Sequence, residues 1–297
     1  MTEQTTSVKV GKIESTPLDI IVPSHNDIEL ISRCLRFLYL YTTSPFHLIV
    51  VDDSTDLTPL WLENEQKKHD NFTLIHHDEP YRCGNQFFEE AFCYCKHEFV
   101  ATVMNSVKVE PEWESVALEF LKGEPTVGTV ALKCVFPTNG LIESIGIKFT
   151  DGYFPLELGR DCVGHLFTSI YEREAVQWAF AIHRLNAVKG NLDTESYHGF
   201  LGWDDLDNCL EIRKKGWRVF YAGSGAGYHE ARATRGTDDK EAIIKNHENA
   251  LTFWRKWGML AAYIKKAGTA EEKKRFKKLG QKMVQLKGEN YGNEINR

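Results

Sequence analysis

Residues Leu18–Thr55, LDIIVPSHNDIELISRCLRFLYLYTTSPFHLIVVDDST, contain the strongest indication of the fold. This stretch begins with a continuous apolar run that ends at Pro23 and continues with apolar residues at helical spacing. A second apolar run then leads to Asp52. Buried runs on either side of an amphipathic helix are typical of parallel strands joined by a right-handed crossover. The stretch therefore predicts the first β-α-β unit of an α/β fold.

The same alternation continues beyond this stretch. Helices are predicted at 57–69 and 84–95, and strands at 72–79 and 98–105. The second half is less regular, with strands predicted at 124–136, 143–149 and 217–223 and helices at 205–216 and 240–266. We expect a mainly parallel central sheet flanked by helices, with further helices at the C-terminus. Ligands of such sheets bind at the carboxyl ends of the strands.

Composition limits the class of protein. A chain of 297 residues, 42% hydrophobic and 12% aromatic, can bury the core of one large domain or two smaller ones. The most apolar candidate for a membrane span, Leu30–Val51, is interrupted by two arginines and a histidine. The first 16 residues are expected to be a polar leader. The seven cysteines are odd in number and lack a CxxC pair, which favours reduced thiols and a cytoplasmic location.

Charge is distributed unevenly. The net charge of -6 disfavours nucleic acid as a partner, but Arg255–Arg297 carries 12 Lys and Arg against 4 Asp and Glu. Phe276, Leu279, Met283 and Leu286 recur at helical spacing among lysines. This pattern predicts either a solvated helix packed on its own domain or an amphipathic helix that binds an anionic membrane surface or partner peripherally.

Polar residues follow the first two strands. His25 and Asn26 come after the first strand, and Asp52 and Asp53 end the second. Paired acids at such an edge can accept hydrogen bonds from a nucleobase or a ribose. The alternative is local, because Ser54 or Asp56 could simply cap the following helix.

Several motifs, taken in order, resemble family 2 glycosyltransferases of the GT-A fold. DIIVPSHNDIELISRCLRFL and LIVVDDSTD resemble the opening of the family, and CGNQFFEEAF its Gly/Asn segment. VMNSVKVEPEW falls where the family has its metal-binding Asp, and VKGNLDTESYHGFLGWDDLDNCLEIRKKGWRVFYAG resembles its acceptor block. The resemblance covers roughly residues 17 to 257. It divides the chain into a leader at 1–16, a GT-A domain at 17–257 and a basic helical extension at 258–297.

The resemblance implies a nucleotide-sugar donor, most often a UDP-sugar, and an inverting transfer to the hydroxyl of a glycan or another acceptor. Matched positions imply a set of donor-binding residues at the strand ends. They are Pro23, His25, Asp52, Asp53, Arg82, Asn85, Asn105 and Ser106.

The resemblance also implies a general base in the segment GWDDLDNC. Asp205, with Asp204 beside it, would deprotonate the acceptor hydroxyl. Trp203 would offer a flat face to the acceptor sugar, and Asp207 would cap the next helix or hold the loop through backbone N–H groups. The alternative is that all three acids are first-turn residues favoured by the helix dipole.

The metal site departs from the family pattern. His229 matches a family histidine that holds a divalent metal or the diphosphate, and Arg232 and Arg235 follow it. The family Asp that binds Mn or Mg falls on Val107, which cannot coordinate a cation, and Asn105 and Ser106 offer only neutral oxygens.

Three explanations remain open for this departure. Transfer could be independent of metal, with Lys108, His229, Arg232 or Arg235 offsetting the charge of the leaving group. Glu110 could supply the ligand after a shift in register, or the domain could have lost catalysis and kept binding. The main reading is an active glycosyltransferase. The alternatives are a pseudoenzyme that binds a nucleotide-sugar or glycan, and a glycosyltransferase that acts on modified nucleic acid.

Overall fold

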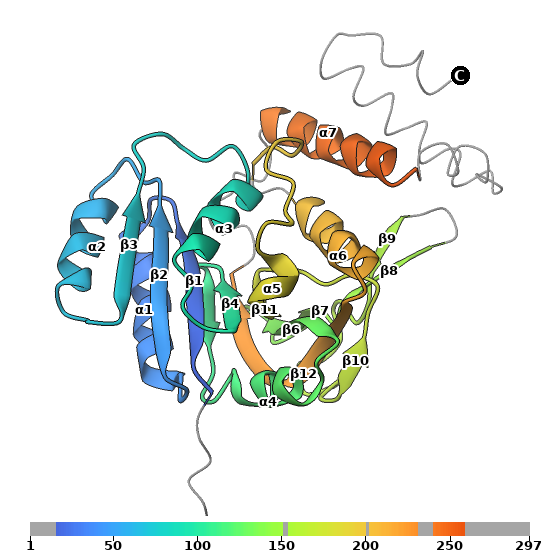
Figure 1. Cartoon of the computed structure of the whole chain (residues 1–297), viewed down its shortest axis with the longest axis horizontal. Coiled ribbons are helices and arrows are strands. Elements are labelled where there is room, and N and C mark those ends of the chain that lie inside the picture. The colour runs from blue at the N-terminus through green and yellow to red at the C-terminus, as the bar shows by residue number, and fades with distance from the viewer. Residues whose placement is uncertain (1–15, 151–153, 200–201, 231–239, 259–297) are drawn as a thin grey trace, which may run out of the picture.

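The computed structural model describes residues 16–150, 154–199, 202–230 and 240–258, which form a central sheet covered by helices on both faces (Figure 1). The strands are β1 (Leu18–Ser24), β2 (Phe46–Asp52), β3 (Phe72–His76), β4 (Phe99–Val103), β5 (Val107–Val109), β6 (Val127–Val135), β7 (Ile142–Ser144), β8 (Ile147–Phe149), β9 (Pro155–Glu157), β10 (Ile170–Glu172), β11 (Phe180–Arg184) and β12 (Arg218–His229). The helices are α1 (Ile28–Tyr41), α2 (Thr58–Gln66), α3 (Gly84–Cys93), α4 (Ser115–Gly123), α5 (Leu185–Val188), α6 (Asp204–Lys214) and α7 (Lys240–Lys256).

Among the described residues, ten strands form one sheet with the order β10-β12-β6-β11-β4-β1-β2-β3, and β5 and β7 pair with β12 and β6. The first half confirms the expected parallel arrangement, because β4, β1, β2 and β3 are parallel neighbours. In this register Ser24 lies opposite Asp52, and Asp52 lies opposite His76. The polar residues that follow these strands therefore meet at one edge of the sheet.

Strand β11 reverses the direction of the sheet and was not predicted from the sequence. It is antiparallel to both β4 and β6, while β12 is parallel to β6. Its residue His183 is fully buried, with one ring nitrogen 3.0 Å from Thr102 Oγ1 and the other 3.0 Å from Thr129 Oγ1. Burial lowers the pKa of His183 from 6.5 to about 3, so the imidazole links the three strands in its neutral form.

The predicted strand at 143–149 is instead split into β7 and β8 at Gly146. Gly146 has φ +112, and a Cβ at this position would lie 2.5 Å from Arg173 Cγ. Only glycine accommodates this turn, because a side chain would meet both backbone strain and the arginine. The break leaves β7 paired with β6, while β8 forms a separate two-stranded sheet with β9.

The helices divide between the two faces of the sheet. One core cluster packs residues of α1, α2 and α4 against the sheet, and the other packs residues of α3, α6 and α7 on the opposite face. The last turn of α7 is fixed to α6 by charge. Lys256 Nζ lies 2.7 Å from Asp207 Oδ2, 3.3 Å from Glu211 Oε1 and 3.4 Å from Asp193 Oδ2.

Several expectations lie outside the described residues. These are the polar leader, except its last residue, and almost all of the basic extension, together with Arg232 and Arg235. The helix predicted at 240–266 is described to the end of α7 at Lys256. No helix in the described part of the chain is long and apolar enough to cross a bilayer.

Candidate active site

A pocket of about 270 Å³ opens where the parallel strands end. Strands β1, β2 and β4 supply its floor at their carboxyl ends, and the segment before α3 supplies one wall. The lining residues are Pro23, Ser24, His25, Val51, Asp53, Pro80, Tyr81, Phe87, Met104 and Asn105. Four of the residues expected to bind the donor, namely Pro23, His25, Asp53 and Asn105, are thus brought together here.

The adjacent acids Asp52 and Asp53 have different environments. Asp53 lines the pocket and holds two neighbours, since its Oδ1 lies 2.8 Å from His25 Nδ1 and its Oδ2 accepts the Tyr81 N–H at 2.9 Å. Asp52 is fully buried below it, accepting from Ser54 Oγ at 2.6 Å and lying 2.8 Å from His76 Nδ1. Asp53 can therefore face a ligand, whereas Asp52 braces the strand ends.

Arg82 and Asn85 do not line this pocket among its described residues. Asn85 is fully buried, and its side-chain amide exchanges hydrogen bonds with that of Asn208 at 3.1 and 2.8 Å. The same amide donates to the Asp193 carbonyl at 3.0 Å. Asn85 therefore joins α3 to α6 beneath the site, while Arg82 is exposed beside it.

Tyr81 is a pocket residue that was not predicted from the sequence. Its hydroxyl donates to Glu90 Oε2 at 2.6 Å, and its backbone is held by Asp53. Its ring packs edge-on against Phe87, with 6.1 Å between the ring centroids. The same strand-end rule that selected Asp53 would have found Tyr81, because it follows β3 at the same edge.

The end of β4 carries no carboxylate next to the pocket. Asn105 lines the pocket, Ser106 is buried, and Val107 is 1% exposed within the apolar core. Antiparallel pairing of β5 with β12 sets Val107 opposite His229 and Lys108 opposite Tyr228. The alternation of side chains along β5 therefore gives Val107 and His229 one face of the sheet.

The basic and acidic residues that flank Val107 face elsewhere. Lys108 Nζ lies 4.4 Å from the centroid of the Phe37 ring. The carboxylate of Glu110 raises the pKa of the Tyr228 hydroxyl, so this acid faces Tyr228 on the other side of the strand from His229. Both orientations follow from the register of β5.

His229 has a carboxylate partner that the sequence did not reveal. Its Nδ1 lies 2.6 Å from Glu143 Oε2, and both residues are buried. Glu143 comes from β7, a short strand whose pairing with β6 brings it to the end of β12. No local signal in the sequence marks this pair, because it depends on two strands that are far apart along the chain.

The acidic residues at the start of α6 also have distinct environments. Asp205 is half-buried, and its Oδ2 accepts the backbone N–H of Trp178 at 3.2 Å. Asp204 is buried, with 6% of its surface exposed. Asp207 is fully buried, bonded to Lys256 and to the Trp257 indole N–H at 2.8 Å, and burial raises its pKa. Asp207 thus anchors α7, which leaves Asp205 as the more accessible acid.

A short connection joins Asp205 to the pocket. The Met104 N–H donates to the Ala179 carbonyl at 2.9 Å, and Ala179 directly follows Trp178. Met104 lines the pocket, whereas Trp178 holds Asp205. One segment before β11 therefore touches both the end of β4 and the first turn of α6.

Trp203 packs against α7. Its ring centroid lies 5.7 Å from that of Phe253 and 5.3 Å from that of Trp254, and its indole N–H donates to Asn246 at 3.3 Å. Its φ of 73° marks a left-handed turn immediately before α6. The contacts place the indole between α6 and α7.

Comparison with known proteins agrees with this architecture. A family model described as "Glycosyl transferase family 2" matches residues 19–166. An uncharacterized protein of Sinorhizobium fredii is 26% identical over 241 residues, which is 76% of this chain. The chain spans about a quarter, 26%, of the length of that curated relative.

Solved structures share the fold at low sequence identity. A mannosyltransferase from Pyrobaculum calidifontis, in complex with GDP-Man and Mn²⁺, has a TM-score of 0.56 and 17% identity, over 94% of this chain and 83% of that one. S. aureus TarS 1-349 with UDP-GlcNAc has a TM-score of 0.53 and 18% identity, over 80% and 67%. GalNAc-T7 with UDP, GalNAc and Mn²⁺ has a TM-score of 0.59 and 11% identity, over 73% and 44%.

The order of strands, the pocket at their carboxyl ends and the family match all agree with the resemblance in the sequence. Through residues 19–166 the chain therefore belongs to glycosyl transferase family 2, and it has the GT-A fold.

Proposed function

We propose that the protein is an inverting glycosyltransferase that moves a sugar from a nucleotide-sugar, most often a UDP-sugar, to an acceptor hydroxyl. The observation that carries this proposal is the link through Met104, Ala179 and Trp178 between the pocket and Asp205. A glycosyltransferase needs a base close to the bond between the sugar and the nucleotide that breaks. This link holds Asp205, an accessible acid, beside a pocket at the carboxyl ends of parallel strands, where such folds bind nucleotides.

In the proposed complex the pocket holds the nucleoside. Asp53 already accepts from His25 and Tyr81, but each carboxylate oxygen has a second lone pair that can accept from a base N–H or a hydroxyl. Tyr81 and Phe87 supply apolar surface for the base. Arg82, exposed beside the pocket, is the proposed contact for the phosphates.

Asp205 is the proposed general base. Its carboxylate would take the proton of the acceptor hydroxyl as that oxygen attacks the anomeric carbon, opposite the departing nucleoside diphosphate, which inverts the configuration. Two features support this assignment. The N–H of Trp178 fixes the orientation of the carboxylate, and Asp205 lies in the first turn of α6, at the positive end of the helix dipole.

The residues at the end of β4 do not fit a Mg²⁺ or Mn²⁺ ion. These cations prefer charged oxygen ligands, and the segment offers an amide, a hydroxyl and the buried side chain of Val107. We therefore route no step of the transfer through such an ion at this position, although Mn²⁺ accompanies the nucleotide or sugar in two of the similar structures.

We also propose that residues 17–257 make up the catalytic unit. The support for this boundary is the bond of Lys256 and Trp257 to Asp207, which joins the end of α7 to the helix of the proposed base. The basic segment that follows is proposed to bind an anionic surface or partner.

The alternative function is binding of a nucleotide-sugar without turnover. The apolar Val107, in the place of the metal-binding Asp of the family, is the observation that favours it. The two functions differ in whether donor is consumed.

The test is release of nucleoside diphosphate from UDP-, dTDP- and GDP-sugars, with and without candidate acceptors. For the variant Asp205→Asn we expect turnover to fall at least about 100-fold, with nucleotide affinity unchanged. Asp70→Asn, on an exposed loop, is the control and should behave as the wild type. Wild-type turnover in Asp205→Asn would exclude the base, and binding of donor without consumption by the wild type would favour the alternative.

A further inference from the structure

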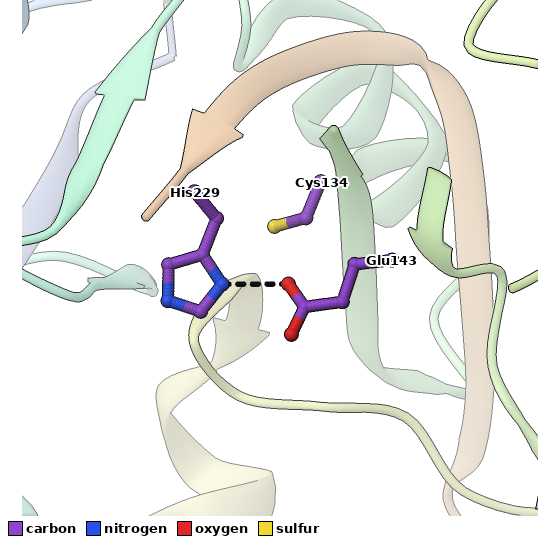
Figure 2. Close-up of side chains that lie close together, drawn as sticks. All are labelled: Cys134, Glu143 and His229. Atoms are coloured by element: carbon purple, nitrogen blue, oxygen red, sulfur yellow. Dashed lines mark hydrogen bonds and ion pairs between the residues drawn. The ribbon is translucent and has the colours of Figure 1, made fainter. Parts of the chain in front are cut away.

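Three strands bring a thiol, a carboxylate and an imidazole together next to β5. Cys134 lies on β6, Glu143 on β7 and His229 on β12, and Figure 2 shows their polar atoms converging on one point. One ligand atom of each residue lies within 4.8 Å of those of the other two. The residues are 5%, 6% and 9% exposed, so the cluster is shielded from bulk water.

The thiol of Cys134 differs from the other buried thiols. Cys34, Cys83 and Cys209 each donate to a backbone carbonyl, at sulfur–oxygen distances of 3.7, 3.7 and 3.5 Å. Within the described ranges, Cys134 has no such acceptor, and its sulfur lies instead on the side of the imidazole that faces Glu143 (Figure 2). A buried polar group without a partner calls for an explanation, and a bound ion supplies one.

The carboxylate of Glu143 also has few hydrogen-bond partners within the described residues. His229 is the one hydrogen-bond partner of Glu143 within the described part of the chain, through the 2.6 Å contact with Nδ1. Sulfur, imidazole nitrogen and carboxylate oxygen together form a ligand set that suits Zn²⁺ and similar borderline cations, whereas Mg²⁺ prefers oxygen alone.

We propose that Cys134, Glu143 and His229 bind a divalent transition-metal ion of the Zn²⁺ class. The site shares His229 with the metal position that the resemblance implies, but Cys134 and Glu143 supply its other ligands, and it uses none of Asn105, Ser106 and Val107 at the end of β4. It does not rest on the proposed transfer reaction. By fastening β6, β7 and β12 to one another, the ion stabilises the end of β12 where it pairs with β5.

Binding needs only a small adjustment of the side chains. Ligands about 2.0 to 2.3 Å from a tetrahedral ion lie about 3.4 Å apart, so the 2.6 Å contact between His229 and Glu143 must open slightly. The thiol proton of Cys134 leaves to solvent, and the Nδ1 proton of a neutral His229 moves to Nε2. The three protein ligands leave a fourth position for water.

The experiment is a titration of the full-length protein, stripped of metal by a chelator, with Co²⁺ followed by Zn²⁺. A thiolate bound to Co²⁺ gives a charge-transfer absorption, which distinguishes this site from one made of carboxylates. We expect one equivalent of Co²⁺ to produce this band and Zn²⁺ to displace it. Unfolding should shift to higher temperature with rising Zn²⁺, since the ion binds the folded state.

The variants Cys134→Ser and Glu143→Gln test the ligands separately. We expect the first to abolish the thiolate band, and each to weaken binding at least about tenfold. Cys34→Ser, which removes a buried thiol outside the cluster, should bind like the wild type. Failure of the wild type to bind one equivalent, absence of the band, or loss of the band in Cys34→Ser but not in Cys134→Ser would overturn the proposal. If Cys134→Ser does not fold, unchanged affinity in Glu143→Gln would also overturn it.

Discussion

His229 on β12 lies opposite Val107 on β5, so the imidazole that we matched to a metal- or diphosphate-binding histidine of the family is paired with an apolar residue. Val107 is 1% exposed in the core cluster that also contains Phe180. Gly227, two residues before His229, leaves the space these side chains fill, because a Cβ there would lie 3.1 Å from Val107 Cγ1 and 3.0 Å from Phe180. The valine is thus an integrated part of the packing.

This packing predicts that Val107→Asp destabilises the protein. The new carboxylate would be buried in the apolar core cluster without a cation, and we expect the free energy of unfolding to fall by at least about 2 kcal/mol. Val116→Asp, at a 39% exposed site, should change it by less than about 0.5 kcal/mol. Urea unfolding of chelated samples measures both. Wild-type stability of Val107→Asp would show that this position accommodates a charge.

Nucleotide binding is expected not to depend on Mg²⁺ or Mn²⁺. The residues at the end of β4 include no carboxylate ligand, so adding either ion to metal-free protein should change the dissociation constant of the preferred nucleotide less than about threefold. Calorimetric titration with UDP, dTDP, GDP and CDP measures this. Binding seen only with one of these ions would show that carboxylates elsewhere hold it.

Asp53→Asn should weaken nucleotide binding at least about tenfold, or 1.4 kcal/mol. The substitution removes the charge that orients His25 and replaces one of the acceptors of the pocket. Asp78→Asn serves as the matched control, because that side chain is fully exposed close by. Equal nucleotide affinity of the two variants would show that Asp53 does not contact the nucleobase.

The buried His183 predicts a loss of stability in acid. Its pKa is lowered to about 3, so below pH 6.5 the unfolded chain takes up a proton that the folded protein does not. The free energy of unfolding should therefore fall with pH by up to about 1.4 kcal/mol per unit from this residue, with no contribution above about pH 7.

His183→Gln should reduce this slope, as measured by denaturant unfolding between about pH 7 and pH 5. His165→Gln, at an exposed position, should keep the wild-type slope. An equal slope in wild type and His183→Gln would assign the acid sensitivity to other groups.

Lys256→Met should destabilise the contact between α6 and α7. The change leaves Asp207 buried without its ammonium partner, and we expect a loss of about 3 kcal/mol in the free energy of unfolding. Lys122→Met, on an exposed part of α4, is the control. Adding Asp207→Asn to Lys256→Met should recover part of the loss, and absence of any recovery would contradict the role of the buried charge.

The first half of the fold could be predicted because helices alternate along the chain with its parallel strands. Each has a continuous apolar run, and each is followed by polar residues at the shared edge. Strand β11 was not predicted, because its sequence FAIHR ends in His183 and Arg184, which suggest an exposed segment. Their burial depends on Thr102, Thr129 and other distant partners.

The residues of the candidate site that directly follow strands could also be predicted from the sequence. Asp53 and His25 follow strands directly, and the pocket forms where they were expected. Glu143 could not be found, because its contact with His229 arises only when β7 folds back on β6 after the turn at residues 136–141. Trp203 and Asn85 look available in the sequence, yet helices α7 and α6 cover them.

The reversal of β11 has a consequence for how such a protein can diversify. Because the segment before this strand is bonded to both Met104 and Asp205, the pocket and the proposed base share one hydrogen-bonded frame. Insertions in the surrounding loops can then reshape the acceptor entrance without changing the spacing between the pocket and Asp205. New acceptors could be acquired at the periphery while the chemistry is inherited intact.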